Sequence, residues 1–322
     1  MTNILSFPGL GIGEFEIRRD AFKFLFGRDV MWYGIIITFG IVLGFCYALY
    51  RSKRENISSD DVLDYGIYCV ISAVIGARLY YVSTYGVKGE TLGEKLYNIV
   101  AIWDGGIAIY GAIIAGAVAI VLVSKFKKIN VMSALDMICP GVMIGQIIGR
   151  WGNFFNIEAF GGPTTLPWRM CSPVVANDFI EKGLIDLSGY QQVLDGTLGA
   201  HPTFLYESLW NLIGFLIINA HYKKKRYNGQ IFLMYISWYG LGRMFIEGLR
   251  TDSLMVGSFR ISQLIGFACF IIGSILLIVL GIANSRKKAK NNDIDVTTAE
   301  SIDGDVIANE TCECTKNIEG DK

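Results

Sequence analysis

Long apolar runs are the feature that most constrains this chain. A helix that crosses the hydrocarbon core of a bilayer needs about 20 mostly apolar residues. The sequence offers runs near residues 30–50, 62–84, 105–124, 131–150, 204–221, 229–247 and 261–283. A mean hydropathy of +0.42 agrees with a bilayer as the solvent. We therefore expect an all-α polytopic membrane protein with about seven transmembrane helices.

The basic clusters of the sequence predict its orientation. Lys and Arg gather after the first, third, fifth and seventh runs, at residues 51–54, 125–128, 223–226 and 286–288. Loops rich in these residues stay in the cytoplasm. The C-terminus is therefore predicted to be cytoplasmic and the N-terminus to lie outside. Segment 155–203 also falls outside, and its several Gly and Pro residues indicate a small head or lid rather than one helix.

The remaining composition sets limits on domains and ligands. We expect residues 1–285 to form one seven-span domain and the polar tail 286–322 to be disordered. A formal net charge of zero gives no reason to expect a nucleic-acid partner. Cys312 and Cys314 lack accompanying histidines, so we expect no metal site, and nothing indicates another cofactor.

Three arginines lie inside apolar runs, where they are expensive. Arg78, Arg150 and Arg243 fall toward the predicted outer ends of the second, fourth and sixth runs. An arginine at bilayer depth costs roughly 2.5–3.5 kcal/mol on insertion scales, so it needs a partner or a water-filled cavity. We expect these residues to lie at a common depth near the outer leaflet.

The fourth run ends in a dense polar stretch. Residues 149–158 read Gly-Arg-Trp-Gly-Asn-Phe-Phe-Asn-Ile-Glu. An ordinary interfacial helix end would account for Trp151 and Arg150, which anchor to headgroups. It would not account for Asn153, Asn156 and Glu158 together. We therefore interpret this stretch as the wall of a polar pocket.

The sixth run carries a polar stripe. Tyr239, Arg243 and Glu247 recur at four-residue intervals and so share one helical face. An alternative is an intrahelical ion pair that only locks the helix. The two interpretations are compatible, because a paired guanidinium is held ready for a phosphate.

Two further residues keep two interpretations each. Tyr110, in the third run, is either an interfacial tyrosine or part of a site. His201 precedes the fifth run and is followed by Pro202, which suits a helix start. Its role as a cap or as a site residue stays open.

Together these segments resemble the prolipoprotein diacylglyceryl transferase family. Residues 149–161 have the form G-R-x-G-N-F-x-N-x-E-x-x-G of the family signature, and the resemblance covers roughly residues 5–285. Further matches are Trp32-Tyr33-Gly34, Gly76-Ala77-Arg78, Gly105-Gly106 to Gly111, His201-Pro202-Thr203 through Glu207, and Tyr239 through Glu247. The resemblance implies a multi-pass enzyme of the bacterial inner or plasma membrane with its site facing outward.

The family reaction, the first step of bacterial lipoprotein maturation, defines the implied partners. It transfers diacylglyceryl from phosphatidylglycerol to the lipobox cysteine beside a prolipoprotein signal peptide, forms a thioether and releases glycerol phosphate. Arg150 and Arg243 would clamp the departing phosphate, because bidentate contacts strengthen as charge builds. Glu158 and Glu247 would orient these arginines, and Asn153 would donate to the headgroup. The predicted lipid-binding set is completed by Gly161, Tyr239, Arg78 and Tyr33.

The acceptor of the thiol proton is left open by the sequence. Many family members carry a histidine where this chain has Tyr110, and a tyrosine with a pKa near 10 is a poor base. Tyr110 remains a candidate beside His201, Glu247 and the leaving phosphate. The catalytic set predicted from the sequence is therefore Arg243, Glu247, Tyr110 and His201.

Two other classes of membrane protein were weighed against this one. Intramembrane charges also mark transporters and channels, but related halves and midplane sites are typical of those, and neither is evident here. A membrane peptidase or phospholipid hydrolase lacks support, since no H-E-x-x-H or G-x-S-x-G motif occurs.

Overall fold

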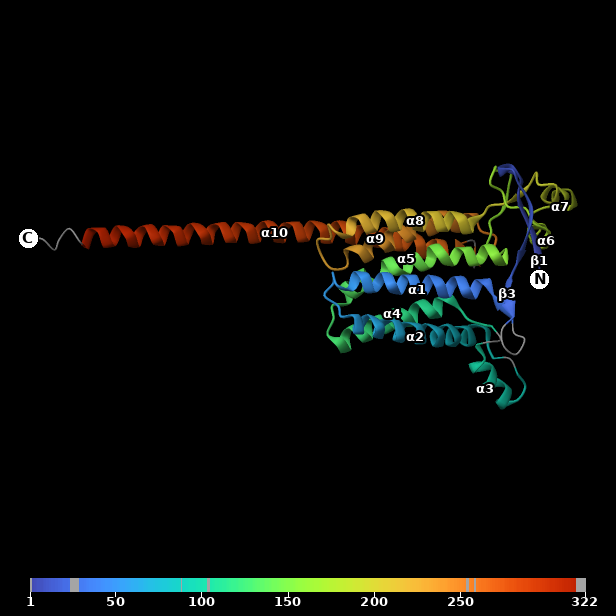
Figure 1. Cartoon of the computed structure of the whole chain (residues 1–322), viewed down its shortest axis with the longest axis horizontal. Coiled ribbons are helices and arrows are strands. Elements are labelled where there is room, and N and C mark those ends of the chain that lie inside the picture. The colour runs from blue at the N-terminus through green and yellow to red at the C-terminus, as the bar shows by residue number, and fades with distance from the viewer. Residues whose placement is uncertain are drawn as a thin grey trace, which may run out of the picture. The chain divides into compact units, whose positions relative to one another are not determined.

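The computed structural model describes residues 2–23, 29–87, 89–102, 105–252, 255–257 and 259–316, with side chains as far as residue 289. Helices form most of it (Figure 1). The long helices are α1 (Trp32–Ser52), α2 (Ser59–Tyr85), α4 (Ile109–Lys127), α5 (Val131–Asn156), α8 (Thr203–Tyr222), α9 (Gln230–Ile246) and α10 (Ile261–Lys316). Each predicted apolar run overlaps one of these helices. The mostly helical, multi-pass character expected from hydropathy is confirmed.

Five of these helices are long and apolar enough to cross a membrane among the described residues. They are α1, α2, α4, α5 and the Ile261–Ala289 part of α10. The other two helices, α8 with 20 residues and α9 with 17, do not meet this measure of length and apolar character. Both nevertheless pack along α5 in the bundle (Figure 1). The count of seven spans therefore stays a prediction.

Helix α5 lies at the centre of this packing. Of its most apolar stretch, 44% is buried inside the protein, against 17% for α1 and α2, so α5 packs against more of the bundle than they do. Close approach to α1 depends on glycines. A β-carbon built on Gly44 would lie 2.5 Å from the carbonyl oxygen of Gly141. Small residues of this kind let membrane helices pack backbone to backbone.

A head of short elements covers the end of the bundle where α1 begins and α5 ends (Figure 1). It contains the antiparallel pair β1 (Thr2–Phe7) and β2 (Ile12–Arg18), helices α6 (Pro173–Glu181) and α7 (Leu187–Leu194), and the pair β5 (Pro163–Thr164) and β6 (Gly199–Ala200). Leu5 and Ile17 of the hairpin share a core with Val175 and Phe179 of α6. The head thus combines the N-terminus with the predicted outer segment.

Smaller elements complete the path of the chain. Beside α1, β3 (Asp20–Lys23) pairs with β4 (Asp29–Met31). Helix α3 (Leu92–Val100) precedes α4, and one-turn helices span Pro8–Leu10 and Glu247–Leu249. The pair β7 (Met255–Val256) and β8 (Phe259–Arg260) leads into α10.

The C-terminal part of the chain differs from the sequence expectation. Where we expected no regular structure after residue 285, α10 continues as helix to Lys316. No proline interrupts this stretch. Extending a helix that the apolar span has already nucleated costs less free energy per residue than starting a new one. By their contacts, residues 1–273 and 274–322 form separate compact units. The division into a domain 1–285 and a tail 286–322 stays a prediction.

Candidate functional site: an arginine cluster around Glu207

Glu207 is a buried carboxylate shared by three arginines. It lies one turn into α8 and is 4% exposed. Arg243 of α9 places Nη1 3.1 Å from Glu207 Oε1, and Arg250 places Nη1 3.4 Å from the same oxygen. Arg150 of α5 pairs with Glu207 Oε2. Side chains from three helices and one loop therefore meet at this carboxylate.

A second buried carboxylate extends the cluster. Arg243 Nη2 lies 2.6 Å from Oε2 of Glu247, which is 2% exposed. Arg243 thus bridges two carboxylates with one planar fork. The side chain of Arg260 donates to the backbone carbonyl of Glu247. The predicted ion pair within one helix turn is present, and it is part of a larger network.

Arg250 connects the cluster to the protein surface. It donates to both carboxylate oxygens of Asp252, at 2.9 and 2.8 Å. Burial acts to lower the pKa of Arg250, but Asp252, Glu207 and Glu247 outweigh that effect and raise it. Burial likewise acts to raise the pKa of Asp252, and pairing with Arg250 outweighs it and lowers it. Both groups therefore stay charged over the whole physiological pH range.

The deeply buried part of the cluster holds more guanidinium groups than carboxylates. Three guanidinium groups, of Arg150, Arg243 and Arg250, face the two deeply buried carboxylates of Glu207 and Glu247. Asp252 sits at the rim with its side chain 40% exposed. With Asp252 counted, three carboxylates match the three guanidinium groups, so the fit of the site to an anionic ligand rests on the convergence of three guanidinium groups at one place. Guanidinium forks match phosphate oxygens in particular.

The polar stretch at the end of α5 contacts this cluster through Asn153. Arg150 Nη1 donates to Asn153 Oδ1 at 3.5 Å, and Asn153 Nδ2 donates to Glu158 Oε1 at 2.9 Å. Asn156 Nδ2 donates to the same Glu158 oxygen at 3.2 Å. Glu158 reaches Arg150 only through Asn153 in these contacts, whereas Glu207 pairs with Arg150 directly. From the sequence we expected Glu158 and Glu247 to orient the arginines, and of these two Glu247 pairs directly with one of them, Arg243.

Gly161 marks a crossing of three chain segments. Its N–H donates to the His201 carbonyl at 2.9 Å, and the next N–H, of Gly162, donates to the Leu249 carbonyl at 2.8 Å. A β-carbon on Gly161 would lie 2.8 Å from both His201 Cβ and the Leu249 carbonyl oxygen. Only glycine allows this approach. Gly161 thereby fixes His201 and the segment before Arg250 beside the cluster.

A cavity of about 630 Å³ opens beside these residues on the head side. Its lining includes Gly162, Lys182, His201, Leu249, Arg250, Met255 and Arg260. The charged side chains in that lining are cations. Burial lowers the pKa of His201 below its ordinary value of 6.5, so the imidazole is mostly neutral at neutral pH. Its Nδ1 lies 3.2 Å from the hydroxyl of Tyr206, and the proton on that contact depends on the tautomer.

The comparison with known families agrees with this arrangement. The family model for prolipoprotein diacylglyceryl transferase matches residues 20–279. The chain belongs to this family. A Finegoldia magna protein named phosphatidylglycerol–prolipoprotein diacylglyceryl transferase is 43% identical over 261 residues, which cover 81% of this chain and 94% of that protein.

Other relatives carry the same name. The match to a Limosilactobacillus reuteri protein is 42% identical over 252 residues and covers 78% of this chain and 86% of the relative. A Trichormus variabilis protein is 41% identical over 250 residues, covering 76% and 83% of the two chains. The family predicted from the signature around Arg150 is confirmed, and the chain is a transferase.

The predicted tyrosines of this transferase surround the cluster at different distances. Tyr239 of α9 interacts electrostatically with Arg243 and Arg150. Tyr33 of α1 interacts in the same way with Glu158 and Arg150. The ring of Tyr33 also explains a glycine of the signature, because a β-carbon on Gly152 would lie 2.7 Å from its Cδ2.

Tyr110, at the start of α4, has a different hydrogen-bond partner. Its hydroxyl lies 2.8 Å from Oγ of Ser262, in the first turn of α10. It interacts electrostatically with Tyr239, which in turn faces the arginines. Tyr110 therefore lies beside the cluster without a hydrogen bond to its arginines among the described contacts.

Arg78 is the predicted site residue that the structure places apart. It donates to backbone carbonyls at the end of α3 and just before α4: Nε to Ile99 at 3.1 Å, Nη2 to Asn98 at 2.5 Å and Nη1 to Gly106 at 2.6 Å. These bonds brace the connection between α3 and α4. A role for Arg78 in lipid binding stays a prediction, and the observed contacts are structural.

The sequence analysis missed two members of the cluster. Glu207 was noted only as the end of a matching string, although a lone carboxylate in an apolar run is itself a signal. Arg250 lies just beyond the sixth run, where an arginine is unremarkable for a helix end. No local pattern predicts that both would meet Arg150 and Arg243.

Proposed function

We propose that this chain transfers the diacylglyceryl group of phosphatidylglycerol to the thiol of the lipobox cysteine in prolipoproteins, the first step of bacterial lipoprotein maturation. Its relatives carry that activity in their names. The observation that carries the proposal is the sharing of Glu207 by Arg150, Arg243 and Arg250. This convergence of guanidinium groups suits the phosphodiester of a lipid headgroup.

The chemistry needs stabilisation of a leaving phosphate. The cysteine sulfur attacks the glyceryl carbon that carries the phosphate, and an S–C bond forms. The bond between that glyceryl carbon and the phosphate oxygen breaks. Its electron pair stays on the oxygen, which leaves as part of glycerol phosphate. Negative charge therefore grows on that oxygen in the transition state. Arg150 and Arg243 are proposed to clamp it, because fixed donors in a water-poor site favour the developing charge.

The buried carboxylates are proposed to position this clamp. Glu207 pairs with Nη1 of Arg243 and Glu247 pairs with Nη2 of the same guanidinium. Glu207 also pairs with Arg150. Asn153 is proposed to orient Arg150 and to donate to headgroup oxygens through its amide. Tyr239, Tyr33 and Gly161 complete the proposed lipid site by their places around these groups.

For the thiol proton we favour His201 over the other candidates. It lines the cavity beside Arg250, and burial lowers the pKa of its imidazole, so that it is available as an acceptor. Glu247 is already engaged in an ion pair with Arg243 at 2.6 Å. The Tyr110 hydroxyl is engaged with Ser262. The leaving phosphate remains the second candidate.

We also propose the placement of the chain in the membrane. Seven helices cross the bacterial cytoplasmic membrane, including the short α9, with the N-terminus and the head outside. The arginine cluster then faces the outer leaflet, where secreted precursors emerge. Residues 1–285 form the catalytic domain and 286–322 a cytoplasmic tail.

A transfer assay tests the proposed function. The purified full chain is mixed with phosphatidylglycerol vesicles and a lipobox peptide, and the peptide is weighed by mass spectrometry. We expect a diacylglyceryl increment, and none with a peptide whose cysteine is replaced by serine or with phosphatidylcholine vesicles. A folded preparation that gives no increment with phosphatidylglycerol would refute the proposal.

A further inference from the structure

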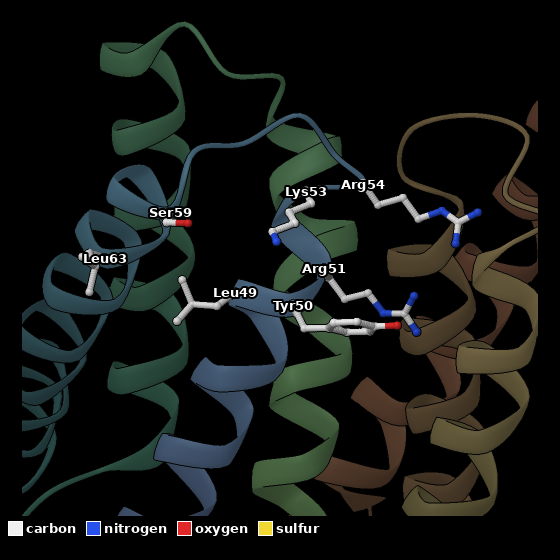
Figure 2. Close-up of a pocket in the computed structure, with 7 residues that line it drawn as sticks. All are labelled: Leu49, Tyr50, Arg51, Lys53, Arg54, Ser59 and Leu63. Atoms are coloured by element: carbon white, nitrogen blue, oxygen red, sulfur yellow. The ribbon is translucent and has the colours of Figure 1, made fainter.

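A second cationic pocket lies at the end of the bundle opposite the head. It has a volume of about 640 Å³ and is formed where α1 ends and α2 begins (Figure 2). Three of its lining residues, Arg51, Lys53 and Arg54, are cations, and no acidic residue lines it. Since α1 and α2 both qualify as membrane spans, this pocket lies at the leaflet opposite the Glu207 cluster.

Arg51 is a fixed charge without a carboxylate partner among the described contacts. It is 6% exposed, and its Nε donates to the Tyr47 hydroxyl at 2.8 Å. Its Nη2 donates to Asn219 Oδ1, and its guanidinium carbon lies 4.2 Å from the ring centre of Tyr222 and 5.1 Å from that of Tyr50. These partners are neutral. They hold the guanidinium in place and leave its charge uncompensated.

Two lysines hold four of the carboxylates near this end of the bundle. Lys225 Nζ lies 2.5 Å from Glu55 and 2.9 Å from Asp136. Lys127 Nζ lies 3.1 Å from Asp61 and 2.6 Å from Asp64. Among the described contacts, no ion pair joins any of these four carboxylates to Lys53 or Arg54, and both cations are exposed.

The rest of the pocket has the character of a lipid site. Leu49 and Leu63 lie on its apolar side, and Tyr50 is 69% exposed at the level of the arginines. Figure 2 shows the Lys53 ammonium and the Ser59 hydroxyl turned toward one another across the space between α1 and α2. The hydrogen-bond donors at the ends of α1 and α2 suit the phosphodiester headgroup of a lipid. The apolar side chains beside them suit its acyl chains, which would lie along the helices.

We propose that this pocket binds an anionic phospholipid of the leaflet opposite the Glu207 cluster, which is the cytoplasmic leaflet in the proposed topology. Lys53 contacts the phosphodiester beside Ser59, and Arg51 and Arg54, which Figure 2 shows turned to the other side of the α1 end, add a positive field; Arg54 Nη2 donates to the Lys223 carbonyl at 3.4 Å. Leu49 and Leu63 contact the upper acyl chain. The apolar side distinguishes a phospholipid from free phosphate, which would make no use of it. The bound lipid holds the α1–α2 connection against the bundle.

Native mass spectrometry of the full chain tests this proposal. The delipidated protein is titrated with phosphatidylglycerol or with phosphatidylcholine of the same acyl chains. The test variant is Lys53→Ala/Arg54→Ala, and the matched control is Lys287→Ala/Lys288→Ala, which removes the same charge from exposed residues of α10. Each cation near a membrane surface contributes about fivefold in affinity. We expect the test variant to bind one phosphatidylglycerol about 25-fold more weakly than wild type and control.

The other outcomes are equally decisive. Equal binding by the test variant and the wild type would show that these cations serve only to orient the chain in the membrane. Equal binding of phosphatidylcholine, or displacement of the lipid by millimolar inorganic phosphate, would also overturn the proposal. The single variants Lys53→Ala and Arg54→Ala, each expected to lose about fivefold, repeat the test with smaller changes if the double variant is unstable.

This experiment is independent of the proposed transfer reaction, because it measures binding and not turnover. The variant Arg150→Lys, placed in the Glu207 cluster, should keep the binding that Lys53 and Arg54 provide. A chain without transferase activity that still shows the 25-fold difference, about the product of two fivefold contributions, would support the lipid pocket alone.

Discussion

Replacing Arg150 by lysine separates the charge of the proposed clamp from its geometry. Arg150 Nη2 pairs with Glu207 while Nη1 contacts Asn153 Oδ1 at 3.5 Å. A lysine keeps the positive charge but has one ammonium group, so it cannot hold both partners and also meet a phosphate with a planar fork. The loss of one hydrogen bond to a charged group amounts to about 1.5–3 kcal/mol. If that bond forms in the transition state, the rate falls roughly 10- to 150-fold.

The assay for Arg150→Lys is the initial rate of diacylglyceryl transfer to the lipobox peptide, measured over a range of phosphatidylglycerol contents. We expect a fall in kcat, because the fork acts on the developing charge. The control is Arg18→Lys, since the Arg18 side chain is 68% exposed and pairs only with Asp20 among the described contacts. Thermal melting of both variants excludes unfolding as the cause. Full activity of Arg150→Lys would refute the clamp.

Further predictions concern other parts of the site. Arg243→Ala should abolish transfer and lower the melting temperature, because breaking a buried pair costs about 3–5 kcal/mol. Gly161→Ala should reduce both stability and transfer, since its β-carbon would lie 2.8 Å from His201 Cβ. Tyr110→Phe should keep transfer within about tenfold and lose about 1 kcal/mol of stability with the bond to Ser262; a larger loss of rate would identify its hydroxyl as the base. Burial lowers the pKa of His201, so transfer and stability should be present above pH 6.5 and fall as the pH drops below it through the lowered value. His201→Gln should remove that fall in stability. If the variant and the wild type showed the same pH dependence of melting temperature and of transfer rate, His201 would be excluded as the proton acceptor.

The bundle was largely predictable from the sequence because bilayer insertion depends on local composition. Each apolar run near 20 residues became a helix, since backbone groups in lipid must be satisfied within the segment. The N-terminal pair β1–β2 was not predicted. Its two strands are neighbours in sequence, but the hairpin packs on α6 and pairs with Cys171, and contacts over that sequence distance have no local signal.

The third run shows the limit of hydropathy in more detail. The predicted span 105–124 begins before the helix, because α4 starts at Ile109. Gly105 and Gly106 both adopt positive φ, at 85° and 72°, and their carbonyls accept hydrogen bonds from Arg78. A hydropathy average cannot distinguish this non-helical segment from the first turn of a helix. The difference lies in the backbone angles of the two glycines and in hydrogen bonds from Arg78, which is far away in the sequence.

The sequence by itself determined that this is a multi-pass membrane transferase of its family, with Arg150 and Arg243 toward the ends of two predicted spans. These properties follow from composition, spacing and one signature, all of which are local. Only the tertiary structure decided that Glu207, rather than Glu158, pairs directly with Arg150, and that Arg250 joins the cluster. The physical reason is that charge pairing at bilayer depth depends on which helices are neighbours. That choice is made by the packing of α5, α8 and α9, and no segment of the sequence specifies it alone.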